Sequence, residues 1–347
     1  MFFILLAGSI ITGCQKDDNF QVIPAPPGAP GITTVLTDAP EFVSTTSALL
    51  GGNIKLDVDG PVFESGIILY APGTTALDDQ GLPSFVEPVI GGTTQKIVSV
   101  SASVGDFSVE VTNLAPNTVY RYKAYAANRS GTFYGDPMYL VTSYGTVVDY
   151  EGNIYQTIKI DERVWMRENL KSTIYSADTS CINGCYQKND DSYNGKRYTW
   201  DAANYLAEKG NSKFIQGVCP VGWHVPSDGE FKDLLAGVGI KPDDFSSDPL
   251  VTVELLGFNQ AGMFKDAGTD KWSGIDITNS TGFSVLPADV CPSPGVTPCV
   301  KTAFWTTTPN IFYGFQSESE KIVRGINPSS ACGFSVRCIK DYYIPEK

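Results

Sequence analysis

The sequence predicts a multidomain protein in which an all-β sandwich precedes an α+β domain. From residue 32 to 143, short runs of alternating apolar and polar residues are separated by Gly, Pro and Asn, a pattern typical of strands with one buried face. From residue 145 to 343, two helix-capping signals stand in a Gly-rich and aromatic background. A chain of 347 residues has room for two or three such domains.

Composition excludes several classes of function. The chain has 25 Lys and Arg against 38 Asp and Glu, a formal charge of −13, so a protein that binds nucleic acid through phosphate contacts is excluded. Only one histidine is present, His224, and a His-rich zinc or haem site is therefore excluded as well. No sequence motif indicates a cofactor. A hydrophobic content of 42% indicates a folded protein.

The N-terminus predicts a lipid anchor. Residues 1–11 are apolar but span about half the roughly 20 residues that a membrane-crossing helix needs. An Ile-Thr-Gly-Cys sequence follows, and it resembles the lipobox of bacterial lipoproteins. The resemblance implies a signal peptide at residues 1–13 and a lipid on Cys14, which would bind outer-membrane lipid. A plain secretory signal followed by an unrelated cysteine is the alternative.

The segment after the cysteine predicts where the anchor faces. Lys16, Asp17 and Asp18 resemble the export tag that sends Bacteroidetes lipoproteins to the outer surface of the outer membrane. An acidic linker is the alternative. Residues 14–31 then form an extended tether because they are rich in proline. The expected location is the extracellular side of the outer membrane.

The first folded domain, residues 32–143, is predicted from its strand-like runs. Clear examples are residues 66–70, 107–111 and 120–125. Residues 114–120, Leu-Ala-Pro-Asn-Thr-Val-Tyr, resemble the corner motif of fibronectin type III domains, which implies that the Tyr120 hydroxyl bonds back to the main chain. Residues 128–131 indicate a hairpin turn. The resemblance implies a fibronectin type III-like sandwich that acts as a spacer.

Two short helices are predicted in the second domain. Ser227 and Glu230 have the spacing of a capping box, and the helix after them is expected to end at Gly237. Thr199 is expected to cap another helix that ends at Gly210. The apolar positions of these helices are Phe231, Leu234 and Leu235 in the first, and Ala203 and Leu206 in the second.

The second domain contains seven short sequence motifs. They occupy residues 148–155, 165–171, 197–203, 219–231, 282–288, 304–308 and 333–341. Together they resemble the Fibrobacter succinogenes major paralogous domain family. The resemblance implies a C-type lectin-like α+β domain over residues 145–343, with a role that is not defined. Tryptophans inside these motifs, Trp165, Trp223 and Trp305, are expected in the core.

Seven cysteines remain once Cys14 is assigned to the anchor, and all lie in the second domain. Their partners are not fixed by the sequence. The family resemblance implies a long bridge between Cys219 and Cys338, because both belong to its motifs. Cys181–Cys185 and Cys291–Cys299 flank tight turns and are candidates for local bridges, which would leave Cys332 as the candidate unpaired cysteine.

Two further motifs only partly match known calcium sites. Asp266-x-Gly268-x-Asp270 lacks the further ligands of a calcium loop, and Thr308-Pro309-Asn310 lacks the carboxylate of a calcium-dependent lectin motif. No metal site is therefore predicted. His224 is expected to bond to the main chain, because it has no second histidine with which to form a metal site.

These features predict a non-catalytic binding or adhesion module for an extracellular glycan or protein, not an enzyme. One alternative is a structural component of the cell envelope with no small ligand. A second is a cryptic enzyme of the formylglycine-generating fold class, in which Cys332 and Cys338 would form a thiol pair. No nucleophile, base or metal cluster supports the second alternative.

Overall fold

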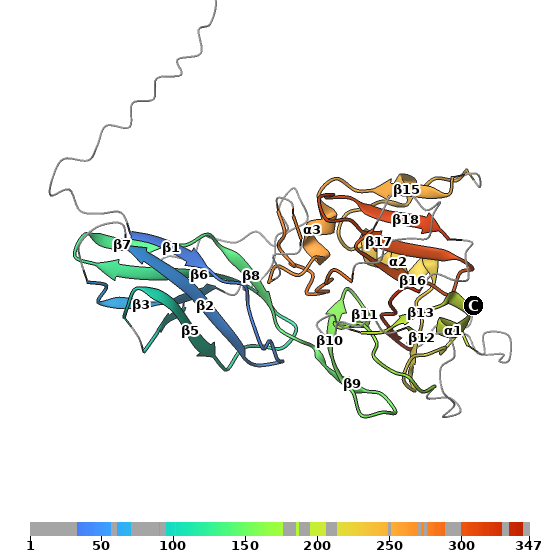
Figure 1. The fold of residues 1–347 in the computed structure, drawn as a ribbon, viewed down its shortest axis with the longest axis horizontal. Coiled ribbons are helices and arrows are strands. Elements are labelled where there is room, and N and C mark those ends of the chain that lie inside the picture. The colour runs from blue at the N-terminus through green and yellow to red at the C-terminus, as the bar shows by residue number, and fades with distance from the viewer. Residues whose placement is uncertain are drawn as a thin grey trace, which may run out of the picture.

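The structure is a computed structural model that describes residues 33–56, 61–70, 90, 95–100, 102–175, 185–186, 195–205, 214–248, 251–268, 272–273, 276–288, 300–327 and 333–342. Two β-rich regions lie side by side, and the chain passes from the first to the second after β8 (Figure 1). The first region contains antiparallel sheets, and the second is largely β with a few short helices and a disulfide.

The first region is built from two antiparallel sheets. A three-stranded sheet has the order β1 (Thr33–Thr37), β2 (Ala48–Leu56) and β5 (Gly105–Val111). A second sheet has the order β4 (Gln95–Val98), β3 (Glu64–Tyr70), β6 (Val119–Asn128) and β7 (Gly131–Tyr134), and β8 (Met138–Val141) also pairs with β6. Apolar residues of both sheets form one core, including Leu50, Ile67, Tyr122, Ala124 and Leu140.

Two local features of this region agree with the sequence. The Tyr120 hydroxyl accepts a hydrogen bond from the Ala115 N–H at 2.7 Å, which confirms the predicted tie to the main chain. The hairpin turn between β6 and β7 is also confirmed, since Asn128 Oδ1 accepts from the Ser130 N–H at 2.8 Å. Gly131 in that turn has φ +146°, a backbone angle that residues with a Cβ rarely adopt.

The second region contains two larger sheets. The five-stranded sheet has the order β14 (Trp223–His224), β19 (Ile339–Lys340), β11 (Arg163–Met166), β10 (Ile154–Ile160) and β9 (Gly145–Val148). The four-stranded sheet has the order β15 (Val253–Leu256), β18 (Ile322–Ile326), β17 (Ile311–Phe315) and β16 (Thr302–Trp305). A short pair joins β12 (Cys185–Tyr186) and β13 (Arg197–Tyr198).

Both faces of the five-stranded sheet are covered by apolar cores. Side chains alternate between the two faces of a strand. Accordingly Met166 and Tyr155 enter one core cluster, whereas Trp165 and Ile158 enter the other. Trp165 and Trp305 are fully buried and Trp223 is nearly so, which confirms the prediction that these tryptophans are core residues.

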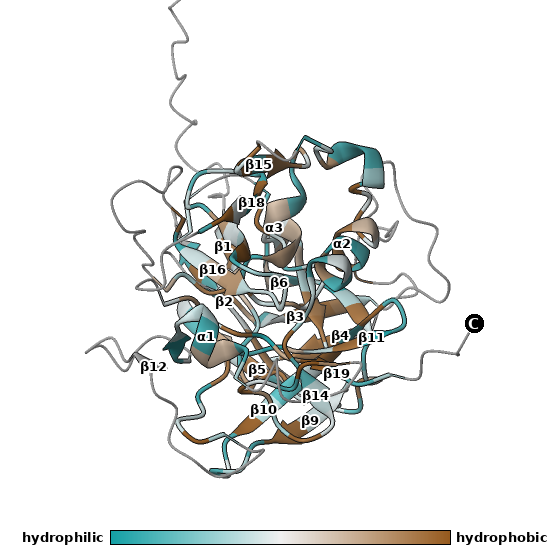
Figure 2. Ribbon diagram, turned by 90° about the vertical axis from the view of Figure 1, so that its right-hand side faces the viewer, coloured by the Kyte–Doolittle hydropathy of each residue, from teal (hydrophilic) through white to brown (hydrophobic). Residues whose placement is uncertain are grey.

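The helices follow their predicted caps closely. Ser227 and Glu230 form the capping box of α2 (Asp228–Ala236), and Gly237 is its C-cap. The Thr199 hydroxyl accepts from the Ala202 N–H at the start of α1 (Trp200–Ala203). The predicted end of this helix at Gly210 is wrong, because α1 ends at Ala203 with Asn204 as its C-cap. The structure adds α3 (Gln260–Phe264) and a 3-10 turn (Pro242–Asp244), neither of which the sequence predicts. Polar and apolar segments are mixed along α1 and α2 (Figure 2).

The two regions share a packed junction. Val141, at the end of β8, belongs to a core cluster of the second region, and its carbonyl accepts from Arg167 Nη1 at 2.8 Å. Asn117 Oδ1 accepts from the Lys159 N–H, also at 2.8 Å. Gly282 has φ +71°, and a Cβ there would lie 2.8 Å from Val141 Cγ1. The first region is therefore docked against the second region through side chains and not only joined to it by the chain.

Candidate functional site

The most deeply buried charge belongs to Arg337. Its guanidinium donates to Asn169 Oδ1 at 2.9 Å, to the Ser284 carbonyl at 2.9 Å, and to the Phe283 carbonyl. Burial lowers the pKa of Arg337 to about 9, against the opposing effect of the Glu168 carboxylate. Every contact is internal and the side chain is 1% exposed. This arginine joins three separate segments of the domain and has no access to a ligand.

A second ionic cluster ties α2 to the four-stranded sheet. Arg324 donates to both carboxylate oxygens of Asp228, at 2.8 and 3.1 Å, and to Glu254 Oε2 at 2.8 Å. The Tyr313 hydroxyl donates to Asp228 as well, at 2.9 Å. Although burial raises the pKa of Asp228, these hydrogen bonds and one from Lys232 lower it below its ordinary value. The cluster is a structural ion pair.

His224 differs from its prediction. It lies 2.8 Å from Glu230 Oε1 through Nε2 and 2.7 Å from Asp341 Oδ1 through Nδ1, so its partners are two carboxylates and not the main chain. The side chain is 2% exposed. Both ring nitrogens are occupied, and a base or nucleophile needs a free nitrogen within reach of a substrate. The geometry therefore gives His224 a structural role.

Many of the predicted site residues lie outside the described part of the chain. They are Cys14, Lys16, Asp17, Asp18, Cys181, Cys291, Cys299 and Cys332, together with the side chain of Cys185. Cys219 and Cys338 do form a disulfide, the long pair that the family resemblance implies. Within the described residues, no group of three or more His, Cys, Asp or Glu could hold a metal ion. Asp266 Oδ1 accepts from the Gly268 N–H and thus closes a local turn.

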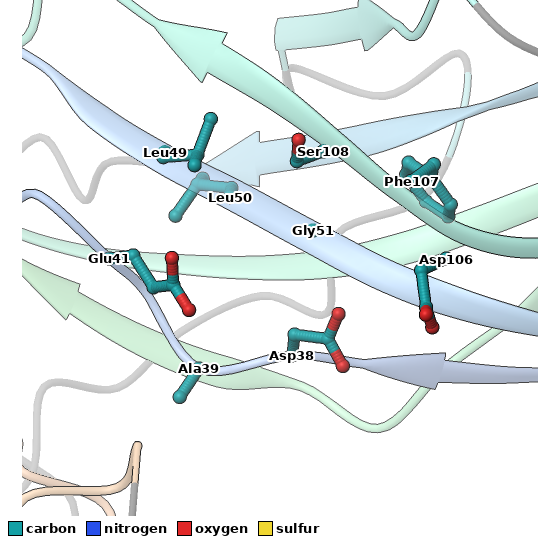
Figure 3. Close-up of a pocket in the computed structure, with 9 residues that line it drawn as sticks. All are labelled: Asp38, Ala39, Glu41, Leu49, Leu50, Gly51, Asp106, Phe107 and Ser108. Carbon is teal, nitrogen blue, oxygen red and sulfur yellow. The ribbon is translucent and has the colours of Figure 1, made fainter.

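A pocket of about 270 Å³ lies on the first region beside β2 (Figure 3). Three carboxylates line it, from Asp38, Glu41 and Asp106, and Leu49 and Phe107 supply apolar walls. Burial raises the pKa of Asp38, and the charges of Asp106 and Glu41 raise it further. The pocket therefore disfavours anionic ligands, and no sequence motif points to any of these residues.

A smaller groove of about 180 Å³ lies at the junction between the two regions. Val119 and Val141 line it from the first region, and Ile158, Val238 and Met263 line it from the second. The same residues belong to, or pack against, a core cluster. The groove is thus a shallow opening above the packed junction.

Four exposed apolar or aromatic side chains lie on or beside the β9–β10 hairpin. Tyr144, Val148, Tyr150 and Ile154 are 47%, 52%, 61% and 67% exposed, respectively, and we call these four residues the hairpin surface. Val148 and Ile154 lie opposite each other in the register of the two strands. Ile158 follows Ile154 on the same face of β10, yet Ile158 is 1% exposed. Val148 and Ile154 therefore continue a buried sheet face beyond the core.

The turn of this hairpin is held by one carboxylate. Asp149 Oδ1 accepts from the N–H groups of Glu151 and Asn153 at 3.0 and 2.9 Å, and Asp149 Oδ2 accepts from the Tyr155 hydroxyl at 2.7 Å. Glu151 in turn accepts from the hydroxyl of Thr173. These bonds hold the turn that carries Tyr150. A surface that is ordered before binding loses less entropy when a partner arrives.

The hairpin also lies at the edge of its sheet. β9 is the end strand in the order β14-β19-β11-β10-β9, so among the described residues its outer edge pairs with no other strand. Alternation in antiparallel pairs directs the main-chain groups of Thr146 and Val148 toward that edge, since Val147 and Asp149 bond to β10. An exposed apolar edge of this kind is a site at which proteins associate.

The fold and the surface together define an antiparallel β region followed by a disulfide-closed, largely β domain that carries an exposed apolar hairpin. The model of the Fibrobacter succinogenes major domain family matches residues 158–340, more than half of the chain, and the protein belongs to this family. β9 and the start of β10 lie before the matched residues, although they belong to the same sheet as β11 and β19.

Comparisons with other proteins are less informative. No curated protein matches the chain. A short form of the sensor domain of the anti-sigma factor RsgI4 from Pseudobacteroides cellulosolvens is 13% identical, covers 33% of this chain and 96% of its own, and has a TM-score of 0.24. A myokine structure is 15% identical, covers 30% and 96%, and has a TM-score of 0.20. Likeness at this level carries no argument about function.

Proposed function

We propose that the protein is a surface-exposed, lipid-anchored protein of the outer membrane whose C-terminal domain is a non-catalytic binding module. The observation that carries this proposal is the hairpin surface, where Val148 and Ile154 extend a buried sheet face into solvent and Tyr144 and Tyr150 are exposed beside β9. Contiguous apolar patches on otherwise well-packed proteins mark sites of interaction. Tyrosine is also enriched among the residues that dominate binding energy.

The chemistry of the patch favours a protein over a glycan. Tyrosine rings can stack on sugar faces as well as on protein side chains. The centre of the patch, however, is the aliphatic pair Val148–Ile154, which offers no ring to stack and no hydrogen bond to a sugar hydroxyl. An apolar side chain of a protein partner would bury this pair favourably. We therefore place an extracellular protein first among ligands and a glycan second.

The domain classes belong to this proposal. The three-stranded and β6-containing sheets, together with the Tyr120–Ala115 bond, support a fibronectin type III-like assignment for residues 32–143. The short helices around twisted sheets and the long disulfide support a C-type lectin-like assignment for residues 145–343. Because the two regions are in contact at Val141, the first domain would fix the orientation of the binding domain as well as hold it away from the membrane.

The membrane anchor is proposed from the N-terminal sequence alone. Cys14 would carry the lipid, and Lys16, Asp17 and Asp18 would direct export. Among the described helices, none combines the length and the apolar character required to span a bilayer. A Cys14→Ser variant expressed in cells tests the anchor, because it should leave the membrane fraction. Protease treatment of intact cells tests the orientation: digestion supports exposure, and digestion only after lysis contradicts it.

The binding proposal is tested with residues 19–347 on a glycan array and on immobilised extracellular matrix proteins. A double variant, Tyr150→Ala with Ile154→Ala, removes the two most exposed side chains of the hairpin surface. A Phe258→Ala variant is the matched control, because Phe258 is 83% exposed but follows β15 in the other sheet. Binding that is lost only in the double variant supports the proposal. If the unaltered protein binds neither the glycan array nor the matrix proteins, the binding proposal is contradicted and the structural alternative is favoured.

A further inference from the structure

The outer edge of β9 carries main-chain groups that have no hydrogen-bond partner among the described residues. Val147 and Asp149 bond to β10, so the N–H and C=O groups of Thr146 and Val148 point away from the sheet. Val148 also belongs to the hairpin surface. A partner that buries the Val148 side chain therefore covers these main-chain groups as well, and buried main-chain groups need new hydrogen-bond partners.

The other end strands of the two larger sheets are protected. β14 has two residues, and both are buried. β16 is buried along its whole length, and Ser335 bonds to its outer edge through the Trp305 N–H and the Ala303 carbonyl. β15 carries the buried charge of Glu254, which bonds to Arg324. Charges, covering segments and short length are the usual protections of a sheet edge. β9, with the sequence Gly-Thr-Val-Val, has neither a charge nor a covering segment among the described residues.

The open edge has the spacing of another polypeptide. Outward-facing groups two residues apart on an antiparallel strand lie about 6.8 Å apart. An extended chain presents N–H and C=O groups with the same repeat, whereas the hydroxyls of a glycan have no such repeat. β9 lies at the lower margin of the second region, on the opposite side from β15 (Figure 1). The edge therefore matches an extended segment of a protein.

We propose that the partner adds an extended segment to the outer edge of β9 as a further antiparallel strand, an inference that rests on the binding role proposed for the hairpin surface. Every strand pair in this five-stranded sheet is antiparallel, so such a segment continues the existing pattern. In complexes of this kind, main-chain hydrogen bonds supply affinity and alternate side chains supply specificity.

The register determines which side chain of the partner meets the hairpin surface. In an antiparallel pair, two residues that exchange both main-chain hydrogen bonds lie directly opposite each other, with their side chains on the same face. The partner residue opposite Val148 therefore joins the row formed by Val148 and Ile154 across β9 and β10. Both side chains are aliphatic and more than half exposed, so an apolar partner residue is favoured at this position.

The charge of the hairpin favours a basic segment from another protein. Between residues 145 and 157 the charged residues are Asp149 and Glu151, and both are acidic. Although burial raises the pKa of Glu151, hydrogen bonds from Thr173 and Ser172 lower it below its ordinary value, so this exposed carboxylate is ionised at neutral pH. A second copy of the chain is disfavoured, because each copy carries a formal charge of −13. The expected segment is apolar where it pairs and has Lys or Arg beside the paired residues.

The test measures binding of a synthetic peptide, Lys-Val-Thr-Val-Thr-Val-Lys, to the full chain by isothermal titration calorimetry. With its valines on the face of Val148, the valine N–H groups point at β9 and the threonine N–H groups point away. N-methylation of the valines should weaken binding at least about tenfold, because hydrogen bonds to the edge are lost. N-methylation of the threonines is the matched control and should change little. A peptide with Glu in place of both Lys residues should bind more weakly than the parent.

A protein variant tests the same edge from the other side. Thr146→Pro removes an outward N–H that β10 does not use, and proline is tolerated where a strand N–H faces solvent. This variant should bind the parent peptide at least about tenfold more weakly than the Phe258→Ala control, whose substitution lies beyond β15 in the other sheet.

Three results would overturn strand addition. They are a parent peptide that does not bind, equal binding of the two methylated peptides, and a dimer of the free chain that Thr146→Pro dissociates, since a second copy would then occupy the edge. Failure of the proposed function is a separate result, which the Tyr150→Ala, Ile154→Ala double variant tests on matrix proteins. If that double variant loses binding while Thr146→Pro keeps it, the hairpin surface binds through side chains alone, and only strand addition is wrong.

Discussion

Removal of the disulfide in C219A/C338A should destabilise the second domain strongly. The bond joins cysteines that are 119 residues apart in the sequence. For a loop of this length, the chain-entropy model gives a loss of about 5 kcal/mol in the free energy of unfolding. Both cysteines are fully buried, so alanine also removes packing contacts in their core cluster. A loss of this size is a large fraction of the stability of an ordinary domain.

Urea unfolding followed by tryptophan fluorescence measures this loss in the correct domain. All five tryptophans, Trp165, Trp200, Trp223, Trp272 and Trp305, lie in the second domain, so the signal does not report the sandwich. C332A is the control, because this cysteine is expected to be unpaired and its replacement should change little. A loss below about 1 kcal/mol in the double variant would refute the chain-entropy reasoning for this bond.

Three further variants test other contacts. Tyr120→Phe removes the acceptor of the Ala115 N–H and should lower the free energy of unfolding by about 1–3 kcal/mol. Urea unfolding followed by far-UV circular dichroism measures this, since the first domain has no tryptophan, and an unchanged midpoint would contradict it. Gly282→Ala should lower the melting temperature, because it adds a Cβ at 2.8 Å from Val141 in a backbone conformation with φ +71°; an equal melting temperature would mean that the junction is loose. Glu230→Gln tests how stability depends on acid pH. The pKa of Glu230 is lowered from 4.5 to about 2, so the stability that its carboxylate contributes is present above pH 4.5 and is lost as the pH falls toward 2. The acid unfolding curve of Glu230→Gln should be flatter over that range than that of the unaltered protein, and parallel curves would contradict the assignment.

The sequence predicts those parts of the fold that depend on near neighbours. The capping box of α2 needs only Ser227 and Glu230, three residues apart, and the tie of Tyr120 needs a hydroxyl and an N–H five residues apart. In contrast, α3 has no side-chain cap, and Gly262 lies in its middle, so no local signal announces it. Its shape is imposed by packing, since three of its residues enter a core cluster.

Contacts between distant segments were beyond prediction for a physical reason. The sequence shows that His224 is the sole histidine, but its two carboxylates come from six residues ahead and 117 residues ahead. Similarly, alternation in β10 indicates that Ile154 and Ile158 share a face. Which part of that face is buried depends on which other segments pack against it. Only the three-dimensional packing shows that Ile154 lies beyond the core.

The central claim is that this protein binds an extracellular partner through the hairpin surface. The most direct measurement is the ratio of dissociation constants between the Tyr150→Ala, Ile154→Ala double variant and the Phe258→Ala control, for the matrix protein or glycan that the unaltered protein binds. Loss of buried hot-spot residues costs about 2 kcal/mol or more, so the account predicts binding at least about 30-fold weaker in the double variant than in the control. Equal dissociation constants in two folded variants would contradict it.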